Sequence, residues 1–358
     1  MAHQDDWNQI CQYCVDDNVF EVTTEDQIPR DANGELLLVG AFGVSKPTRL
    51  LDGREVLRMV INAIPSNLVQ LMIMGDLGMF PVDPPWPTLI LGLGEGLLWD
   101  SEDVKSCFTI YRMIPEWRRY FTLSKQAMVN GVWCWVLVAV LPMGWLSAVG
   151  VAQHLFRRVL SSPLAGSALL PHQRELRRDK PFPACEGGAG PRWWWSIYID
   201  DFDRGQVWPL DVISALENDA QTVPPADVLA DVWATMDRFG LPREMKTSKA
   251  NQVWFASRGA FVDGRLGYAR ASSDKVANIV GLSSFLVSHP HMPRKWLEFC
   301  LGRWGFIHSF RRPLTRVCGS LFNSRGHYQW PSLAAGPRRQ RALVVIVRAA
   351  PGSGRHEA

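Results

Sequence analysis

The tetrapeptide Tyr198-Ile199-Asp200-Asp201 lies between an aromatic run, Trp193-Trp194-Trp195, and the turn-forming residues Phe202-Asp203-Arg204-Gly205. An apolar strand that ends in two adjacent carboxylates at a tight turn places oxygen atoms where a divalent cation can collect them. Mg²⁺ takes oxygen ligands and commonly joins one or two carboxylates to a substrate phosphate. Nucleotidyl transfer uses two such cations, about 3.5–4 Å apart, to hold the attacking and leaving oxygens. Alone, the tetrapeptide is also compatible with a β-turn whose carboxylates are only solvated.

A second pattern lies upstream, in Leu141-Pro142-Met143-Gly144-Trp145 and the small residues that lead to Gln153. Pro142 stops a strand, and Gly144 lets the backbone approach a base or a sugar closely. This segment resembles the template-primer and nucleotide-binding segment of reverse transcriptases, which runs Leu-Pro-Gln-Gly-Trp and has a second Gln downstream. The resemblance implies nucleotide-binding roles for Gly144 and Gln153. Met143 stands where the family usually has Gln.

The segment from Ser101 to Ile110 resembles the first catalytic strand of the same family, in which an aromatic residue follows the catalytic Asp by five positions. Of three neighbouring acidic residues, Asp100, Glu102 and Asp103, only Asp103 has this spacing to Phe108. The resemblance implies that Asp103 binds both metal ions. It also implies that Phe108 is a steric gate against a ribose 2′-hydroxyl, although a core aromatic residue would look the same in sequence.

A third segment, Arg58 to Asn67, resembles the fingers strand of these enzymes. Arg58 matches the position that grips the incoming triphosphate, and a guanidinium fork suits phosphate oxygens better than an ammonium does. Asn62 stands where the family usually has Asp. A surface Arg at the end of a strand is the alternative interpretation of Arg58.

Three further segments follow the acidic turn in the order that the family shows. Lys246 and Lys249 follow Phe239-Gly240-Leu241-Pro242, and the resemblance implies that one of them is the cation near the pyrophosphate leaving group; their spacing does not decide which. Residues 258–267 resemble the hairpin that grips the primer end, and 294–307 resemble the start of the thumb. The expected primer-grip residues are Gly259, Phe261 and Gly264.

Six segments in the family's order, over residues 45–320, resemble a reverse transcriptase of the retrotransposon type. The resemblance implies an α+β polymerase right-hand fold with fingers, a palm whose antiparallel sheet is backed by helices, and a partial thumb. The expected divisions are a polar, poorly ordered leader at 1–35, fingers and palm at 36–290, the start of the thumb or connection at 291–325, and a basic flexible tail at 326–358.

The implied chemistry is template-directed DNA synthesis, with Asp103, Asp200 and Asp201 as catalytic carboxylates. The expected metal site comprises Asp103, Val104, Asp200 and Asp201, and it would take two Mg²⁺ ions, for which Mn²⁺ can substitute. The expected partners are an RNA or DNA template with its primer, a dNTP, and other domains of a retroelement polyprotein, of which this chain is a fragment or a degenerate copy. The alternative is a catalytically inactive domain of the same fold that binds nucleic acid or protein, which Met143 and Asn62 favour and the intact acidic set opposes.

Composition narrows the class of protein. The chain has 358 residues, of which 47% are hydrophobic, and a net charge of +3, so any surface for nucleic acid must be local. Cys11 and Cys14 form a lone C-x-x-C pattern without a second pair at zinc spacing, and the other cysteines are scattered, which favours a reducing compartment. The first thirty residues are acidic and do not read as a signal peptide. We therefore expect an intracellular protein of the nucleus or the cytoplasm.

The apolar run from Val132 to Val151 leaves a membrane-associated protein as a rival interpretation. Pro142 and Gly144 divide the run, which therefore reads as a buried strand followed by a helix. Apolar residues at helical spacing predict another helix over 226–239, with Gly240 as its C-terminal stop and the palm sheet above it. The loop from Ser161 to Pro191 is long and is expected to be an exposed insertion.

Overall fold

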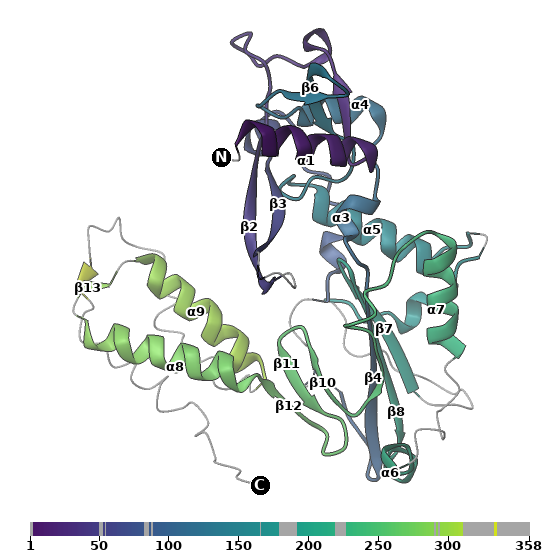
Figure 1. Ribbon diagram of the computed structural model, residues 1–358. Helices are drawn as coiled ribbons and strands as arrows, with labels where there is room; N and C mark the ends of the chain where they lie inside the picture. Colours follow the sequence, from purple (N-terminus) through teal and green to yellow (C-terminus); the bar gives the residue numbers. More distant parts are fainter. Residues whose placement is uncertain are drawn as a thin grey trace.

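The computed structural model describes residues 3–49, 53, 55–81, 86, 89–164, 166–178, 192–218, 227–289, 291–292, 294–310 and 333–334. Helices and strands are mixed along the chain, as expected for an α+β protein. A layer that contains α1 and β6 lies at one end, a long antiparallel sheet lies at the other, and a pair of helices projects to one side (Figure 1).

The N-terminal layer packs helix α1 (Gln4–Asp16) against a three-stranded antiparallel sheet in the order β1 (Phe20–Thr23), β6 (Val132–Val138), β5 (Ala127–Val129). Trp7 and Cys11 lie one turn apart on α1 and are buried, and the Trp7 indole donates to the Lys125 carbonyl at 3.2 Å. The expectation of a poorly ordered leader is therefore wrong for residues 3–35. Of the acidic residues that suggested it, Asp5, Asp6 and Asp16 lie on the exposed side of a helix whose other side is apolar.

Strands β2 (Gly40–Arg49) and β3 (Glu55–Asn62) form a two-stranded antiparallel ribbon that extends from this layer toward the rest of the molecule (Figure 1). At the base of the ribbon the Ile61 N–H donates to the Met143 carbonyl at 3.1 Å. Helix α2 (Ile64–Leu68) follows β3 directly. The segment expected to be the fingers strand is thus a strand that carries Arg58 on an exposed ribbon.

The central sheet has the order β7 (Arg192–Tyr198), β8 (Asp201–Pro209), β4 (Glu95–Asp103), β9 (Lys249–Gln252), and its neighbouring strands are antiparallel. Strand β4 ends at Asp103, so the expectation that the strand continues to Ile110 is wrong. Ser106 adopts a left-handed conformation, with φ 57°, and Cys107–Ile110 forms the short helix α3. The Val104 and Lys105 N–H groups instead donate to loop carbonyls, those of Asp200 and Pro242.

Side chains alternate across the central sheet, because successive residues of a strand point to opposite faces. On one face Trp195, Ile197 and Phe202 join the main core with helices α5 (Ala148–Ser161) and α7 (Asp227–Arg238). On the other face Trp99 stacks on Phe255, with ring centroids 4.7 Å apart and planes within 6°. Phe255 belongs to a second antiparallel sheet in the order β10 (Trp254–Ser257), β11 (Ala260–Asp263), β12 (Tyr268–Ala271).

The helix expected over 226–239 is confirmed as α7, which ends at Arg238, and Gly240 has the positive φ of 66° typical of a C-terminal stop. The apolar run 132–151 is confirmed as strand β6 followed by the start of α5. Within the described parts of the chain, none of the helices combines the length and the apolar character that crossing a membrane requires.

The connection after α5 is packed over part of its length. Leu170 and Leu176 are buried, and the Leu176 N–H donates to the Trp195 carbonyl at 2.7 Å, so the expectation of an exposed insertion is wrong for residues 170–176. Residues 179–191 of the expected loop lie outside the described residues.

Helices α8 (Ser273–Ser288) and α9 (Arg294–Ser309) pack on each other around Trp304, whose indole donates to the Ser283 hydroxyl at 2.9 Å. Apart from residues 333–334, the tail expected at 326–358 lies outside the described residues. The remaining elements are short: η1 (Glu25–Gln27), η2 (Leu77–Met79), α4 (Pro115–Arg118), η4 (Arg119–Phe121), η5 (His172–Arg174), α6 (Leu210–Asn218), β13 (His291–Met292) and β14 (Leu333–Ala334).

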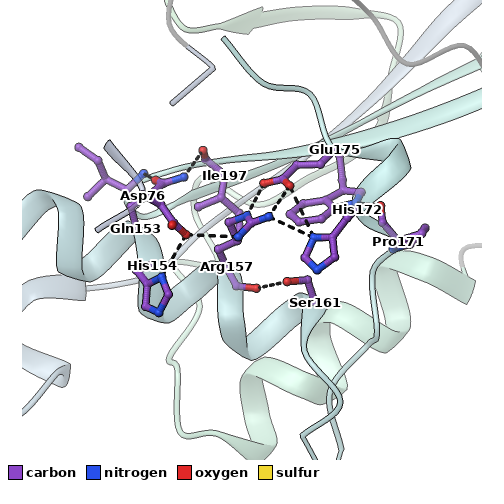
Figure 2. Close-up of polar contacts among 11 residues, drawn as sticks. Asp76, Gln153, His154, Arg157, Ser161, Pro171, His172, Glu175 and Ile197 are labelled. Atoms are coloured by element: carbon purple, nitrogen blue, oxygen red, sulfur yellow. Dashed lines mark hydrogen bonds and ion pairs between the residues drawn. The ribbon is translucent and has the colours of Figure 1, made fainter. Parts of the chain in front are cut away.

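A buried ion pair fastens α5 to the segments on either side of it (Figure 2). The Arg157 guanidinium donates to both Glu175 carboxylate oxygens, at 2.5 and 2.8 Å, and to Asp76 at 3.4 Å. The exposed fractions of these side chains are 11% for Arg157, 4% for Glu175 and 9% for Asp76. His154 and His172, both about half exposed, lie against the two carboxylates. The pair therefore joins three stretches of chain at the back of the central sheet.

We expect Arg157→Met to lower the free energy of unfolding by about 3–5 kcal/mol, because the substitution leaves two buried carboxylates without their cation. Chemical denaturation of the variant measures this loss. The matched control is Arg158→Met, since Arg158 is exposed on the same helix and its loss should change stability little. A loss for Arg157→Met no larger than that of the control would show that the ion pair does not hold the three stretches together.

Candidate metal centre

Three carboxylates converge where strands β4, β7 and β8 end. Asp103 pairs with Asp201 in the register of β4 and β8, and the Val104 N–H donates to the Asp200 carbonyl at 2.9 Å. One carboxylate oxygen from each of Asp103, Asp200 and Asp201 lies within 4.8 Å of the others. The expectation that these residues meet is confirmed, and three carboxylate oxygens are a donor set that suits Mg²⁺ or Mn²⁺.

The turn that carries Asp200 has an unfavourable backbone conformation. Ile199 has φ 62°, a left-handed conformation that costs about 1–2 kcal/mol for a residue with a β-carbon. The Gln153 side chain supports it from α5, because its amide nitrogen donates to the Ile197 carbonyl at 2.8 Å (Figure 2). The Gln153 amide oxygen accepts from the Ile199 N–H at 2.7 Å. Gln153 thus binds the main chain on both sides of the turn.

The expectation that Gln153 contacts a nucleotide is therefore wrong. Its side chain is 1% exposed, and both ends of its amide are occupied by the backbone of the acidic turn. The family resemblance located Gln153 near the site, but it could not show that the residue acts from behind the turn. Gln153 is a positioning residue for Asp200 and Asp201.

Burial, together with neighbouring charges at Asp103 and Asp201, raises the pKa values of the three carboxylates. Burial, followed by the neighbouring charges of Asp200 and Glu244, raises the pKa of Asp103 to about 6. Burial, followed by Asp200 and Asp203, raises the pKa of Asp201 to about 7. Burial also raises the pKa of Asp200, while a backbone hydrogen bond and the Arg58 charge act in the opposite direction. A bound cation would relieve this crowding.

The two other acidic residues of β4 have structural roles. Asp100 accepts from the Arg204 guanidinium at 2.5 Å and from the Asn251 N–H at 2.7 Å. Glu102 accepts from the Trp233 indole at 2.6 Å and from the Ser248 hydroxyl. Both carboxylates are fully buried and point to the face opposite Asp103. This alternation explains why only Asp103 reaches the acidic turn.

Two residues near Asp103 were missed in the sequence. The Glu244 N–H donates to the Asp103 carbonyl at 2.9 Å, and the Thr247 hydroxyl lies 3.5 Å from the Asp103 carboxylate. They belong to the loop that follows α7, 144 positions later in the chain for Thr247. Lys246 is exposed in this loop, and Lys249 is exposed on β9 opposite Ser101. Lys249 therefore lies on the same face of the sheet as Asp103, and Lys246 lies in the loop that carries Thr247.

Gly144 and Phe108 lie close to the junction of ribbon and sheet. Gly144 has φ 116°, and a β-carbon there would lie 2.1 Å from the Ile61 carbonyl oxygen. Only glycine therefore allows the 141–145 segment to pack on the base of the ribbon. Phe108 is half-buried on α3 and packs against the main core. The core contact expected for an aromatic residue at this position is thus present.

The expected primer-grip residues lie on the β10–β12 sheet. Gly259 is in the two-residue turn between β10 and β11, and Phe261 lies on β11, 5.2 Å below the Arg270 guanidinium. Gly264 follows β11 and faces β4 instead. Its N–H donates to the Val253 carbonyl, and its carbonyl accepts from the Leu97 N–H at 2.8 Å. A β-carbon at position 264 would lie 2.0 Å from the Leu97 carbonyl oxygen. Gly264 is therefore required for packing between the two sheets, and the primer contact expected of it is wrong.

Comparison with solved structures identifies the fold. A foamy viral protease-reverse transcriptase, dRH form, in complex with double-stranded DNA has a TM-score of 0.58 and 13% sequence identity over 97% of this chain and 48% of its own. The foamy viral protease-reverse transcriptase in complex with double-stranded DNA gives 0.58 and 14% over 96% and 56%. The same protein in complex with an RNA/DNA hybrid gives 0.55 and 14% over 97% and 36%.

The likeness extends over nearly all of this chain, which spans about half the length of the first two structures and about a third of the last. No protein-family model and no curated protein sequence matches the chain. Identities of this size show the fold alone. The expectation of an α+β polymerase right-hand fold is confirmed.

The raised pKa values determine how stability depends on pH. Both groups have folded pKa values, about 6 and about 7, above the ordinary value of 3.8. Ionisation of the cluster therefore lowers the free energy of unfolding, and this effect is complete above about pH 7. This destabilisation decreases as the pH falls through 7 and then through 6. A cation that binds the ionised carboxylates should stabilise the fold most at the higher pH.

We expect Asp201→Asn to raise the melting temperature at pH 8 without metal, because it removes one of the crowded charges. Addition of Mn²⁺ at pH 8 should raise the melting temperature of the unsubstituted protein and have much less effect at pH 5.5 or on the variant. Thermal unfolding at the two pH values measures both effects. Glu35→Gln, at an exposed carboxylate, is the control. A melting temperature of the unsubstituted protein that Mn²⁺ leaves unchanged at pH 8 would contradict a metal centre.

Proposed function

We propose that this chain catalyses template-directed DNA synthesis as a reverse transcriptase of the retroelement type. In this reaction a primer 3′-hydroxyl attacks the α-phosphate of a dNTP, the bond to the β-phosphate oxygen breaks, and pyrophosphate leaves. The observation that carries the proposal is the convergence of Asp103, Asp200 and Asp201 carboxylate oxygens within 4.8 Å at the end of a palm-type antiparallel sheet. A β-turn whose carboxylates were only solvated would not require Asp103 to lie beside Asp200 and Asp201.

The donor set supports a divalent metal cofactor. Asp103, Asp200 and Asp201, with Val104 beside them, would hold two Mg²⁺ ions, and Mn²⁺ could replace them. When bound, such a metal pair supplies activation of the hydroxyl and neutralisation of charge on the leaving oxygens. The chain's own contribution is to fix the three carboxylates, through the β4–β8 register and through Gln153.

Several side chains around the cluster suit the substrates of this reaction. Arg58 is exposed on the fingers ribbon, and its charge acts on Asp200, so its guanidinium is available to the triphosphate. Lys246 or Lys249 would lie near the pyrophosphate, and Phe108 would exclude a 2′-hydroxyl. Gly259 would grip the primer together with Phe261.

The solved structures of similar fold are complexes with double-stranded DNA and with an RNA/DNA hybrid. This supports a template-primer duplex, with an RNA or DNA template, as the partner of this chain. Sequence choice would come from base pairing, so the protein needs contacts to backbone and shape more than to bases. Such a substrate is consistent with an intracellular site of action in the nucleus or the cytoplasm, next to other domains of a polyprotein.

We expect Asp200→Asn to reduce primer extension on poly(rA)·oligo(dT) by more than about 10²-fold with Mg²⁺ or Mn²⁺, because it removes a metal ligand from the reacting centre. Binding of the template-primer, measured by fluorescence anisotropy, should remain within about threefold. Glu35→Gln should retain full activity. Absence of extension by the unsubstituted protein with either metal would contradict the proposal and favour a binding domain without catalysis.

We expect Phe108→Ala to admit ribonucleotides, raising the ratio of ribonucleotide to deoxynucleotide incorporation by about tenfold or more, because the aromatic ring no longer excludes the 2′-hydroxyl. Phe108→Tyr keeps the ring and is the matched control, which should discriminate as the unsubstituted protein does. Single-nucleotide addition with each sugar gives the ratio. If Phe108→Ala leaves the ratio unchanged, Phe108 serves the core alone.

A further inference from the structure

A second row of polar side chains lies directly behind the catalytic row of the palm sheet. Tyr198, Asp201 and Asp103 face one another across β7, β8 and β4. Two residues further along each strand, on the same face, the register aligns Ser196, Asp203 and Ser101. A side chain that contacts this second row therefore lies two residues along the strands from the proposed metal carboxylates.

Arg258 is the residue that fills this position. Its guanidinium contacts the Ser196 hydroxyl at 3.3 Å, lies 3.9 Å from the Asp203 carboxylate, and donates to the Pro81 carbonyl at 2.7 Å. The side chain is only 10% exposed. Asp203 has further donors in the Trp99 indole and the Ser257 hydroxyl, so its charge does not depend on Arg258 alone.

Arg258 is an unfavourable choice for its own local backbone. Ser257 pairs with Ala260, so Arg258 and Gly259 form a two-residue turn, and both have positive φ, 48° and 81°. Turns of this kind prefer Asn-Gly, and a left-handed conformation is unfavourable for an ordinary residue with a β-carbon. A residue that breaks a local rule marks a site where a longer-range contact compensates for it. The buried guanidinium contacts are that compensation.

The other residue of the turn faces the helix pair. A β-carbon at Gly259 would lie 2.1 Å from the Lys275 ammonium on α8 and 3.3 Å from the Phe306 ring on α9. Lys275 itself lies 5.1 Å from the centre of the Phe306 ring. The turn therefore stands between the thumb helices on one side and the second polar row of the palm on the other.

We propose that Arg258 is a positioning residue that locks the β10–β11 turn to the row behind Asp201, so that the hairpin and the metal carboxylates keep one relative geometry. The inference rests on the proposed function, because the hairpin is there expected to hold the primer end. An error of about 1 Å in the placement of a reacting group can lower a rate by about 10²-fold. A fixed distance between primer hairpin and carboxylates is therefore a requirement of the reaction.

The test replaces Arg258 by Asn, which suits the turn better than Arg but cannot reach the second row. We expect the rate constant for single-nucleotide addition to fall by about 10–100-fold, with the dissociation constant for template-primer within about threefold. The melting temperature should stay within a few degrees, since the turn itself is improved. Arg258→Lys should recover part of the rate, because an ammonium keeps the charge and loses the fork. Arg158→Asn, at an exposed residue of α5, should behave as the unsubstituted protein.

An unchanged rate for Arg258→Asn would overturn the proposal. Parallel losses of rate, binding and melting temperature would also overturn it, because they indicate a role in folding alone. If the unsubstituted protein shows no extension, the proposed function fails. Amide hydrogen exchange then tests whether Arg258 holds the β10–β11 turn against the row behind Asp201. The Val104 and Ile199 amides, which bind Asp200 and Gln153, should then exchange faster in Arg258→Asn than in the unsubstituted protein. Equal exchange rates in the variant and the unsubstituted protein would overturn the positioning role of Arg258.

Discussion

The register between β4 and β8 is the constraint on which the site depends. Nine consecutive residue pairs, from Glu95 opposite Pro209 to Asp103 opposite Asp201, fix which side chains share a face. A slip by one residue would turn Asp103 to the opposite face. The slip is opposed by packing in the middle of this register, where Gly205 pairs with Trp99: a side chain at position 205 would lie 2.5 Å from the Trp194 ring, so only glycine fits there. Aromatic packing in the middle of the sheet thus helps to set the geometry of the carboxylates at its end.

Acidic side chains on the two faces of this sheet have different surroundings, because successive residues of a strand point to opposite faces. Asp100 and Glu102 accept hydrogen bonds from neighbouring strands and from α7 inside the protein, and one oxygen of Glu102, Oε1, is buried without a hydrogen-bond partner. Burial, followed by acidic neighbours, raises the pKa values of Asp103 and Asp201 on the other face. The first pair is held inside the protein, and the second belongs to the cluster for which a divalent cation is proposed.

Features that depend on local sequence patterns were predicted from the sequence, and features that depend on contacts between distant residues were missed. The spacing of Asp103 to Phe108 selected the correct acid among three, and Gly240 ended its helix as expected. The role of Gln153 was wrong because a motif places a residue near a site without showing which side of the turn it supports. The contact of Thr247 with Asp103 joins residues 144 positions apart and leaves no local pattern. The burial of Trp7 was missed because acidic neighbours dominate the composition of that segment.

Three locally unfavourable features lie together on one part of the palm: the left-handed Ile199, the left-handed Arg258 and the crowded carboxylates. Such features persist where the surrounding structure over-determines them, and they cluster at functional sites. For the proposed nucleic-acid partner the crowded carboxylates are unfavourable, since they repel phosphates. A surface meant only for binding would be better served by amides or cations at these positions. In the proposed function, divalent cations bound at Asp103, Asp200 and Asp201 would turn this repulsion into attraction, which would account both for the cost of the cluster and for its place beside the β10–β11 hairpin.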